Sequence, residues 1–94
     1  MQATAPLYFS TRFNRNVRLT RHAREAMTKR TLTPDIVQTI IEQGDWLDKG
    51  NNHGWISHHF PERTDNLLCV AAIIEQAVII KTVMTGWQPE ETPS

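Results

Sequence analysis

Two stretches in the first half of the chain have the apolar spacing of amphipathic helices. The first follows Thr20, whose hydroxyl can cap a helix, and its apolar positions are Ala23, Ala26 and Met27. The second follows Thr33 and Pro34, and its apolar residues between positions 36 and 41 form one stripe before Gly44. The spacing therefore predicts two helices joined by a very short connection, as in a helical hairpin.

After Gly44 the spacing of apolar residues shortens to that of β-strands. Strands are expected near residues 45–49, 54–60, 67–74 and 77–84, with a short apolar segment at 17–19 before the first helix. The two most apolar runs, joined by Glu75-Gln76, should be the central strands. The expected fold is α+β: an N-terminal helical hairpin packed on a four-stranded antiparallel sheet, in a two-layer sandwich.

The length of 94 residues predicts one domain, with a core at about residues 7–87 and a loose C-terminal tail at 88–94. No run approaches the ~20 apolar residues of a membrane span, and the N-terminus has no continuous apolar segment of a secretory signal. We expect a cytoplasmic protein with no membrane contact. Cys69, the one cysteine, lies in the run LLCVAAII and is expected to be a buried core thiol.

The formal net charge of zero hides an uneven distribution. Residues 1–31 carry seven Arg or Lys and one acidic residue, a balance of +6, and residues 32–94 carry three basic and nine acidic residues, a balance of −6. A basic side could meet a phosphate-bearing or acidic partner. Alternatively, the two halves neutralise one another in the fold.

Arginine recurs at every third position from Arg12 to Arg24. Such a row would suit an RNA backbone, which is held through several phosphate contacts, but a solvated surface is an equally good interpretation. The aromatic residues lack the spacing of any RNA-binding motif. The candidate phosphate or RNA ligands are Arg18, Arg21, Arg24, Arg30 and Lys81.

His22 would lie in the first turn of the first helix, where the helix dipole and nearby arginines disfavour a protonated imidazole. A neutral histidine beside a bound phosphate can act as a general base. The alternative is a partly buried histidine that caps or packs against the helix. His58 and His59 are adjacent on a predicted strand and cannot share one metal ion, and His53 lies in a turn. No metal or other cofactor is expected.

Lys81 and Thr82 interrupt the last apolar run, AVIIKTVM. Regular strand alternation predicts that their side chains point to opposite faces of the sheet. Lys81 could be a phosphate ligand on the sheet, or a strand lysine that discourages aggregation.

A short motif runs from the first helical stretch into the second. It consists of His22-Ala23-Arg24-Glu25, Met27 and Arg30, followed by Leu32-Thr33-Pro34-Asp35. This motif resembles the signature H-A-x-x-R-M-x-x-R-G-[IL]-[ST] of the bacterial family catalogued as "domain of unknown function 4258". Glu42-Gln43-Gly44 and the segment 79–83 match later parts of the same family pattern. The sequence departs from it at Ala26, where arginine is common, and at Thr31, where glycine is common.

The order of elements also resembles RelE-type and barnase-like ribonuclease toxins. This resemblance implies a RelE-like fold and a metal-independent ribonuclease. In such a site His22 would be a base or acid, Arg24 and Arg30 would hold phosphate, and Thr82 with Lys81 would form the opposite wall.

Two functions of different classes follow. The first is a RelE-like toxin that cleaves RNA and has a protein antitoxin as partner. The second is a noncatalytic binding module, such as an antitoxin or accessory protein, that pairs through its sheet edge or basic helix. The basic N-terminal third and His22 favour the first function, whereas the neutral net charge and the missing arginine at Ala26 favour the second.

Overall fold

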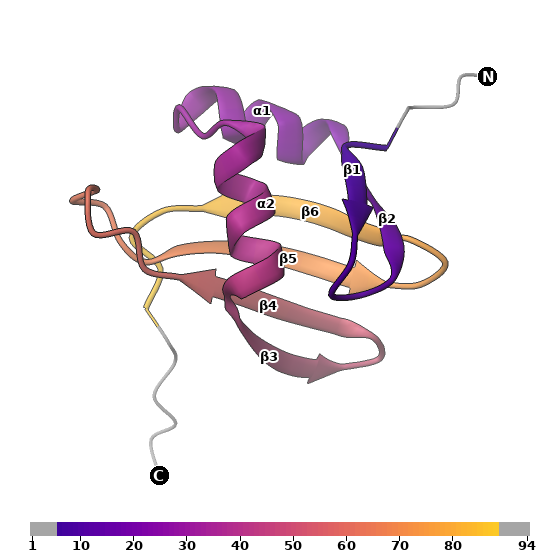
Figure 1. The fold of residues 1–94 in the computed structure, drawn as a ribbon. Coiled ribbons are helices and arrows are strands. Elements are labelled where there is room, and N and C mark those ends of the chain that lie inside the picture. Colours follow the sequence, from indigo (N-terminus) through magenta and orange to yellow (C-terminus); the bar gives the residue numbers. More distant parts are fainter. Residues whose placement is uncertain (1–5, 89–94) are drawn as a thin grey trace, which may run out of the picture.

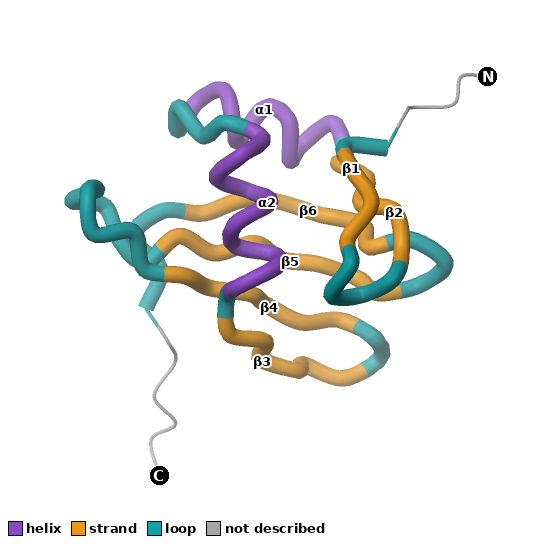
Figure 2. The backbone as a smooth tube through the Cα atoms, viewed as in Figure 1, coloured by secondary structure: helices purple, strands orange, loops and turns teal. Residues whose placement is uncertain are grey.

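The structure, a computed structural model, describes residues 6–88, which form one six-stranded mixed sheet and two helices. The strands are β1 (Tyr8–Ser10), β2 (Arg15–Leu19), β3 (Asp45–Gly50), β4 (His53–His58), β5 (Leu68–Ile74) and β6 (Val78–Met84). The helices are α1 (Arg21–Lys29) and α2 (Pro34–Gln43). Both helices lie on one side of the sheet (Figures 1 and 2), so the fold has two layers.

The strand order across the sheet is β1-β2-β6-β5-β4-β3. The pairing of β2 with β6 is parallel, and every other neighbouring pair is antiparallel. The chain thus passes from β2 through both helices to β3, at the opposite edge of the sheet, and returns strand by strand to β6. Residues far apart in sequence, Leu19 and Ile80, become direct neighbours.

The two expected helices and their caps are confirmed. The Thr20 hydroxyl accepts a hydrogen bond from the Ala23 N–H at 3.0 Å, and the Thr33 hydroxyl accepts one from the Ile36 N–H at 3.3 Å. Gly44 ends α2 where a side chain would come within 2.5 Å of the Ser57 carbonyl oxygen. The absence of a side chain at Gly44 therefore lets the end of α2 lie directly against β4.

The core lies between the helices and the sheet. Its fully buried residues include Val17, Ile56, Val70, Val78 and Ile80 from the strands, and Ala23, Val37, Ile40 and Ile41 from the helices. Cys69 is buried as expected, although its pairing with Ser57 and Met84 places it on the face of the sheet away from the helices. Burial raises the pKa of its thiol to about 12. The hydrophobic effect of this single layer of contacts holds the helices to the sheet.

The expected four-stranded antiparallel sheet with an N-terminal helical hairpin is wrong. The sheet has six strands, it is mixed, and two strands precede the helices. The strand β1 has only three residues and so leaves almost no alternation in the sequence. The parallel pairing of β2 with β6 joins segments about sixty residues apart, which no local spacing of apolar residues reveals.

The expected loose tail at 88–94 lies outside the described residues except for Gln88. Within the described part of the chain, neither helix has the length and apolar character needed to cross a membrane.

Candidate functional site

One face of the sheet is covered by the helices, and we call the other its open face. Direct pairing places residues of neighbouring strands on the same face, so the open face can be followed from strand to strand. Its residues at the centre are His53, Trp55, Ala71, Ile79, Lys81 and Thr82, with Arg18 towards the β1 edge and Leu47 and Lys49 on β3. Phe9 and Leu47, at its two ends, are 52% and 41% exposed.

Two lysines line one hollow of about 200 Å³ on this face. Lys49 from β3 and Lys81 from β6 line it together with His53, Trp55 and Ala71. No Asp or Glu is among the described residues that line it. The hollow is therefore suited to an anion, because its fixed charges are positive and no carboxylate offsets them.

Both lysines lie at irregularities of the strand pairing. Ala71 pairs with Thr82 and Ala72 with Ile80, so Lys81 is an extra residue in β6. The β3–β4 pairing is likewise shifted between Asp48 and Gly50, on either side of Lys49. β-Bulges re-aim side chains and are frequent beside functional sites.

The bulge also corrects the expected alternation of Lys81 and Thr82. Thr82 pairs with Ala71, which in turn pairs with Trp55, so Thr82 belongs to the open face. Lys81 lines the hollow on that same face, and Val83 is buried under the helices. The prediction that Lys81 and Thr82 point to opposite faces is wrong because it assumed a regular strand.

An aromatic platform borders the lysine hollow. The ammonium of Lys49 lies 4.8 Å from the ring centroid of Trp55, a cation–π distance. The Trp55 and Trp87 rings meet edge to face, with centroids 5.5 Å apart. Trp55 is only partly buried, so part of this ring remains accessible.

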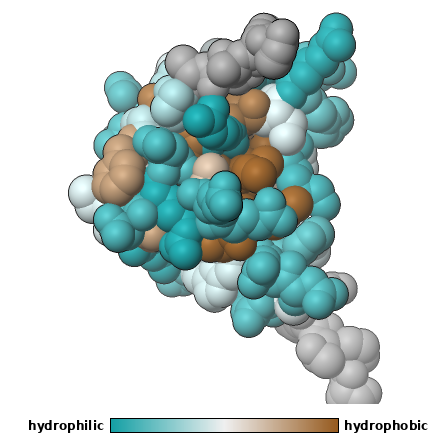
Figure 3. All heavy atoms as spheres, turned by 90° about the vertical axis from the view of Figure 1, so that its right-hand side faces the viewer, coloured by the Kyte–Doolittle hydropathy of each residue, from teal (hydrophilic) through white to brown (hydrophobic). Residues whose placement is uncertain are grey.

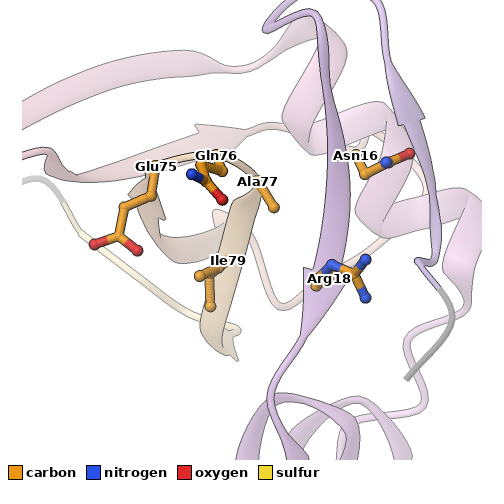
Figure 4. A pocket seen from close by; sticks show the side chains of 6 residues that line it. All are labelled: Asn16, Arg18, Glu75, Gln76, Ala77 and Ile79. Carbon is orange, nitrogen blue, oxygen red and sulfur yellow. The ribbon is translucent and has the colours of Figure 1, made fainter. Parts of the chain in front are cut away.

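A second hollow, of about 410 Å³, lies between the start of β6 and β2. It is lined by Asn16, Arg18, Glu75, Gln76, Ala77 and Ile79. Figure 4 shows Glu75 and Arg18 on opposite sides of this hollow, with the carboxylate directed away from the guanidinium. From that side of the molecule the surface is mainly hydrophilic, with apolar residues visible in several places between the hydrophilic ones (Figure 3).

The first turn of α1 is tied to the Lys81 bulge. The Thr20 hydroxyl donates to the Lys81 carbonyl oxygen at 3.1 Å, and the Thr20 N–H donates to the Ile80 carbonyl oxygen at 3.1 Å. His22 lies two residues further on and is exposed. The first turn of α1, on the covered side of the sheet, thus contacts the backbone of β6 at Ile80 and Lys81, whereas the Lys81 and Thr82 side chains belong to the open face. The structure does not show the partly buried histidine of the alternative interpretation.

The expected row of arginines does not form one surface. The Arg12 guanidinium donates to the carbonyl oxygens of Ile41 and Gly44, at 2.9 and 2.7 Å, and so caps the end of α2. Arg15 donates to the Phe13 carbonyl oxygen at 2.9 Å. Both of these arginines serve the fold rather than a ligand.

The remaining arginines of the row lie apart from one another. Arg18 lies on the open face, whereas Arg21 pairs with Glu25 on the exposed side of α1, with Nε and Oε2 3.5 Å apart. Arg24 lines an apolar hollow on the helix side. Arg30 is the C-cap of α1, about 12 Å along the helix from His22. Of the predicted phosphate ligands, only Arg18 and Lys81 belong to the open face.

A separate polar cluster joins β1 to α2. The Glu42 carboxylate accepts hydrogen bonds from the Tyr8 hydroxyl at 2.6 Å, the Thr11 hydroxyl at 3.2 Å and the Arg12 N–H at 3.0 Å. Burial alone would raise the pKa of Glu42, but hydrogen bonds from Ser10 and these three groups outweigh it and lower the pKa. Burial and the Glu42 contact raise the pKa of Tyr8 well above its usual range. This cluster anchors the short strand β1.

Across residues 6–88 no three His, Cys, Asp or Glu side chains gather in a way that could hold a metal ion. The open face offers instead cationic and aromatic side chains together with one imidazole, and the carboxylate of Asp45 lies at the start of β3 on the same face, outside the lysine hollow.

Comparison with known proteins identifies a family. Residues 19–85 match the family described as Domain of unknown function (DUF4258). The chain belongs to this family. No curated protein and no solved structure matches the chain. The resemblance stated from the His22 motif is thus confirmed at the level of the family, and the further likeness to RelE-type toxins finds no support in these comparisons.

One departure from the family signature has a visible structural effect. Thr31, where glycine is common, follows α1 with a φ of +56°. Glycine adopts this left-handed conformation without steric cost, whereas a β-branched residue is strained there. The glycine of the signature is therefore explained by the turn between α1 and α2.

The sequence analysis missed three members of the lysine hollow as a group: Lys49, His53 and Trp55. The available signal was the alternation of Trp55 and Ser57 with the buried Ile56 on the predicted strand 54–60. The assignment of His53 to the preceding turn is wrong, because β4 begins at His53. Without the strand order, nothing showed that this row would face Lys81 across β5.

Proposed function

We propose that the protein binds single-stranded RNA on the open face of its sheet. The observation that carries this proposal is the hollow lined by Lys49, Lys81, His53 and Trp55, with no Asp or Glu among its described lining residues. Lysines supply phosphate contacts, and an accessible tryptophan supplies a surface on which an unpaired base can stack.

The dimensions of the face suit an extended strand. Arg18 on β2 and Lys49 on β3 are separated by four inter-strand steps, because the order between them is β2-β6-β5-β4-β3. At ~4.8 Å per step this is about 19 Å. A short stretch of single strand can therefore contact both ends of the cationic surface and the hollow between them.

Two features favour RNA with unpaired bases. A base stacks on an aromatic ring only when it is not paired in a duplex. Thr82, beside Lys81 on the same face, offers a hydroxyl that can recognise the ribose 2′-OH.

Binding is tested by the fluorescence anisotropy of a labelled single-stranded RNA between about 50 and 200 mM salt, in EDTA. With phosphate contacts from Arg18, Lys49 and Lys81, log K should fall with log salt at a slope of about −2. Lys81→Ala should reduce this slope by about 0.7. Lys29→Ala on exposed α1 is the control and should leave it unchanged. Absence of binding at the low-salt end would contradict the proposal.

Metal-independent cleavage of the bound strand is a second candidate, favoured by the Thr20 hydrogen bond that ties the first turn of α1, in which His22 lies, to the backbone carbonyl of Lys81. In this reaction His22 takes the proton of the ribose 2′-OH, whose oxygen forms a bond to phosphorus while the bond from phosphorus to the 5′ oxygen breaks. A solvent water molecule gives a proton to the departing oxygen, and Lys81 stabilises the charge on the phosphorane. The products are a 2′,3′-cyclic phosphate and a 5′-hydroxyl.

Cleavage is tested in EDTA with His22→Ala and His53→Ala, the second being the imidazole that lines the lysine hollow. Loss of cleavage in His22→Ala, with RNA affinity retained, supports the assigned role. Loss of cleavage in His53→Ala but not in His22→Ala would assign the catalytic histidine to the lysine hollow instead. If the wild-type protein binds RNA but does not cleave it, and its expression does not arrest growth, the protein is a noncatalytic binding module.

A further inference from the structure

A third hollow lies on the helix side of the molecule, away from the open face. Its volume is about 350 Å³, and it lies between α1, the end of β2 and the segment that leads into α2. Its lining residues are Leu7, Leu19, Arg24, Met27, Thr28, Leu32 and Pro34. Most of these side chains are apolar and none is aromatic, so this surface is not suited to stacking bases. We call it the α1 groove.

The exposed side of α1 is basic. Its exposed charged residues are Arg21, Arg24, Glu25 and Lys29, followed by the C-cap Arg30. Glu25 is engaged by Arg21, at 3.5 Å. Arg24, at the rim of the groove, forms no ion pair with any residue between 6 and 88, and no Asp or Glu of that range lines the groove.

The two properties together define one kind of occupant. Apolar lining favours a partner that buries apolar side chains, and Arg24, the one cation among the described lining residues, favours a carboxylate beside them. Arginine is well suited to hold a carboxylate through two parallel hydrogen bonds. We propose that the α1 groove docks an acidic amphipathic helix of a partner protein, with its apolar stripe on the partly exposed Leu7 and Leu19 and its carboxylates at Arg24.

The groove suits a short helical segment. On α1 it is lined by Arg24, Met27 and Thr28, which span about 6 Å of the helix axis. A docked helix contacts such a length with apolar residues at i and i+3 or i+4. A second copy of this chain is a poorer occupant, because it would bring the same basic helix towards the groove.

The test is selection of binders from a displayed library of helical peptides, followed by measurement of their affinity for the full chain. We expect selected peptides to combine Asp or Glu with apolar residues at helical spacing. Arg24→Glu should weaken their binding about tenfold or more, which corresponds to about 1.4 kcal/mol. The matched control is Lys29→Glu, which makes the same charge change on the same exposed helix outside the groove, and it should change affinity less than about twofold.

Equal losses in Arg24→Glu and Lys29→Glu would overturn the proposal, because net charge alone would then explain the binding. Selected peptides without acidic residues, or unaffected by Arg24→Glu, would also overturn it. Concentration-dependent dimerisation abolished by Arg24→Glu would assign the groove to a second copy instead. Lys81→Ala, which changes the open face, should leave peptide affinity intact, so this proposal and RNA binding can fail independently.

Discussion

On β6, Val78 and Ile80 are fully buried beneath the helices, whereas the neighbouring Ile79 remains partly exposed on the open face. The covered face is built from aliphatic side chains of both layers. The open face instead combines apolar residues with lysines at two bulges and with a tryptophan platform. The same strands thus present one surface that stabilises the fold and another whose exposed apolar and cationic residues the fold does not require.

The largest difference between the faces should appear in stability. Ile80→Ala removes a fully buried side chain and should lower the free energy of unfolding by about 2–5 kcal/mol. Ile79→Ala, one residue away on the open face, should lower it by less than about 1.5 kcal/mol. Urea denaturation measures both values. Equal losses would mean that the open face is also part of the core.

The second largest difference is expected in RNA affinity, measured on folded protein so that it is separate from stability. Trp55→Leu should weaken RNA binding by about 1–3 kcal/mol, because it removes the stacking surface. Trp46, which packs on Phe13 on the covered side, is the matched control. Trp46→Leu should lower the free energy of unfolding and leave the RNA affinity of the folded protein unchanged. Anisotropy titration at a temperature where both variants are folded provides the comparison.

A smaller effect concerns the turn that joins the two covering helices. Thr31→Gly should raise the free energy of unfolding by about 1 kcal/mol, because it relieves the strain of a β-branched residue at φ +56°. RNA affinity should not change. Destabilisation by this substitution would show that the Thr31 side chain contributes contacts that exceed the backbone strain.

The smallest effect is expected from the Glu42 cluster, which anchors β1 at the edge of both faces. The folded-state pKa of Glu42 lies below its ordinary value of 4.5, so its contribution to stability is present above that pH. It is lost as the pH falls through the lower folded-state pKa. The stability difference between the wild type and Glu42→Gln should therefore shrink in acid, and a constant difference in urea denaturation across that range would contradict it.

The features that were predicted correctly from the sequence depend on residues close together along the chain. Both helices begin at the threonines whose hydroxyls cap them, and Cys69 is buried, because capping and apolar spacing are local signals. The parallel pairing of β2 with β6 and the bulge at Lys81 are not local. Both depend on how the strands pair across the sheet. The bulge places Lys81 and Thr82 on the same face.

The same distinction between local and non-local signals applies to the candidate site. Arg18 could be selected from the regular row of arginines, and Lys81 and Thr82 because they interrupt an apolar strand. Their grouping with Lys49 and Trp55 required the order of strands in the sheet.

The most direct test of the open face as the RNA-binding surface is a matched pair of charge reversals. Lys81→Glu changes the open face and Lys29→Glu changes exposed α1, with the same change in net charge. In an anisotropy titration with single-stranded RNA at low salt, Lys81→Glu should weaken binding about tenfold or more and Lys29→Glu less than about twofold. Equal weakening by the two variants, or a larger loss in Lys29→Glu, would contradict the assignment.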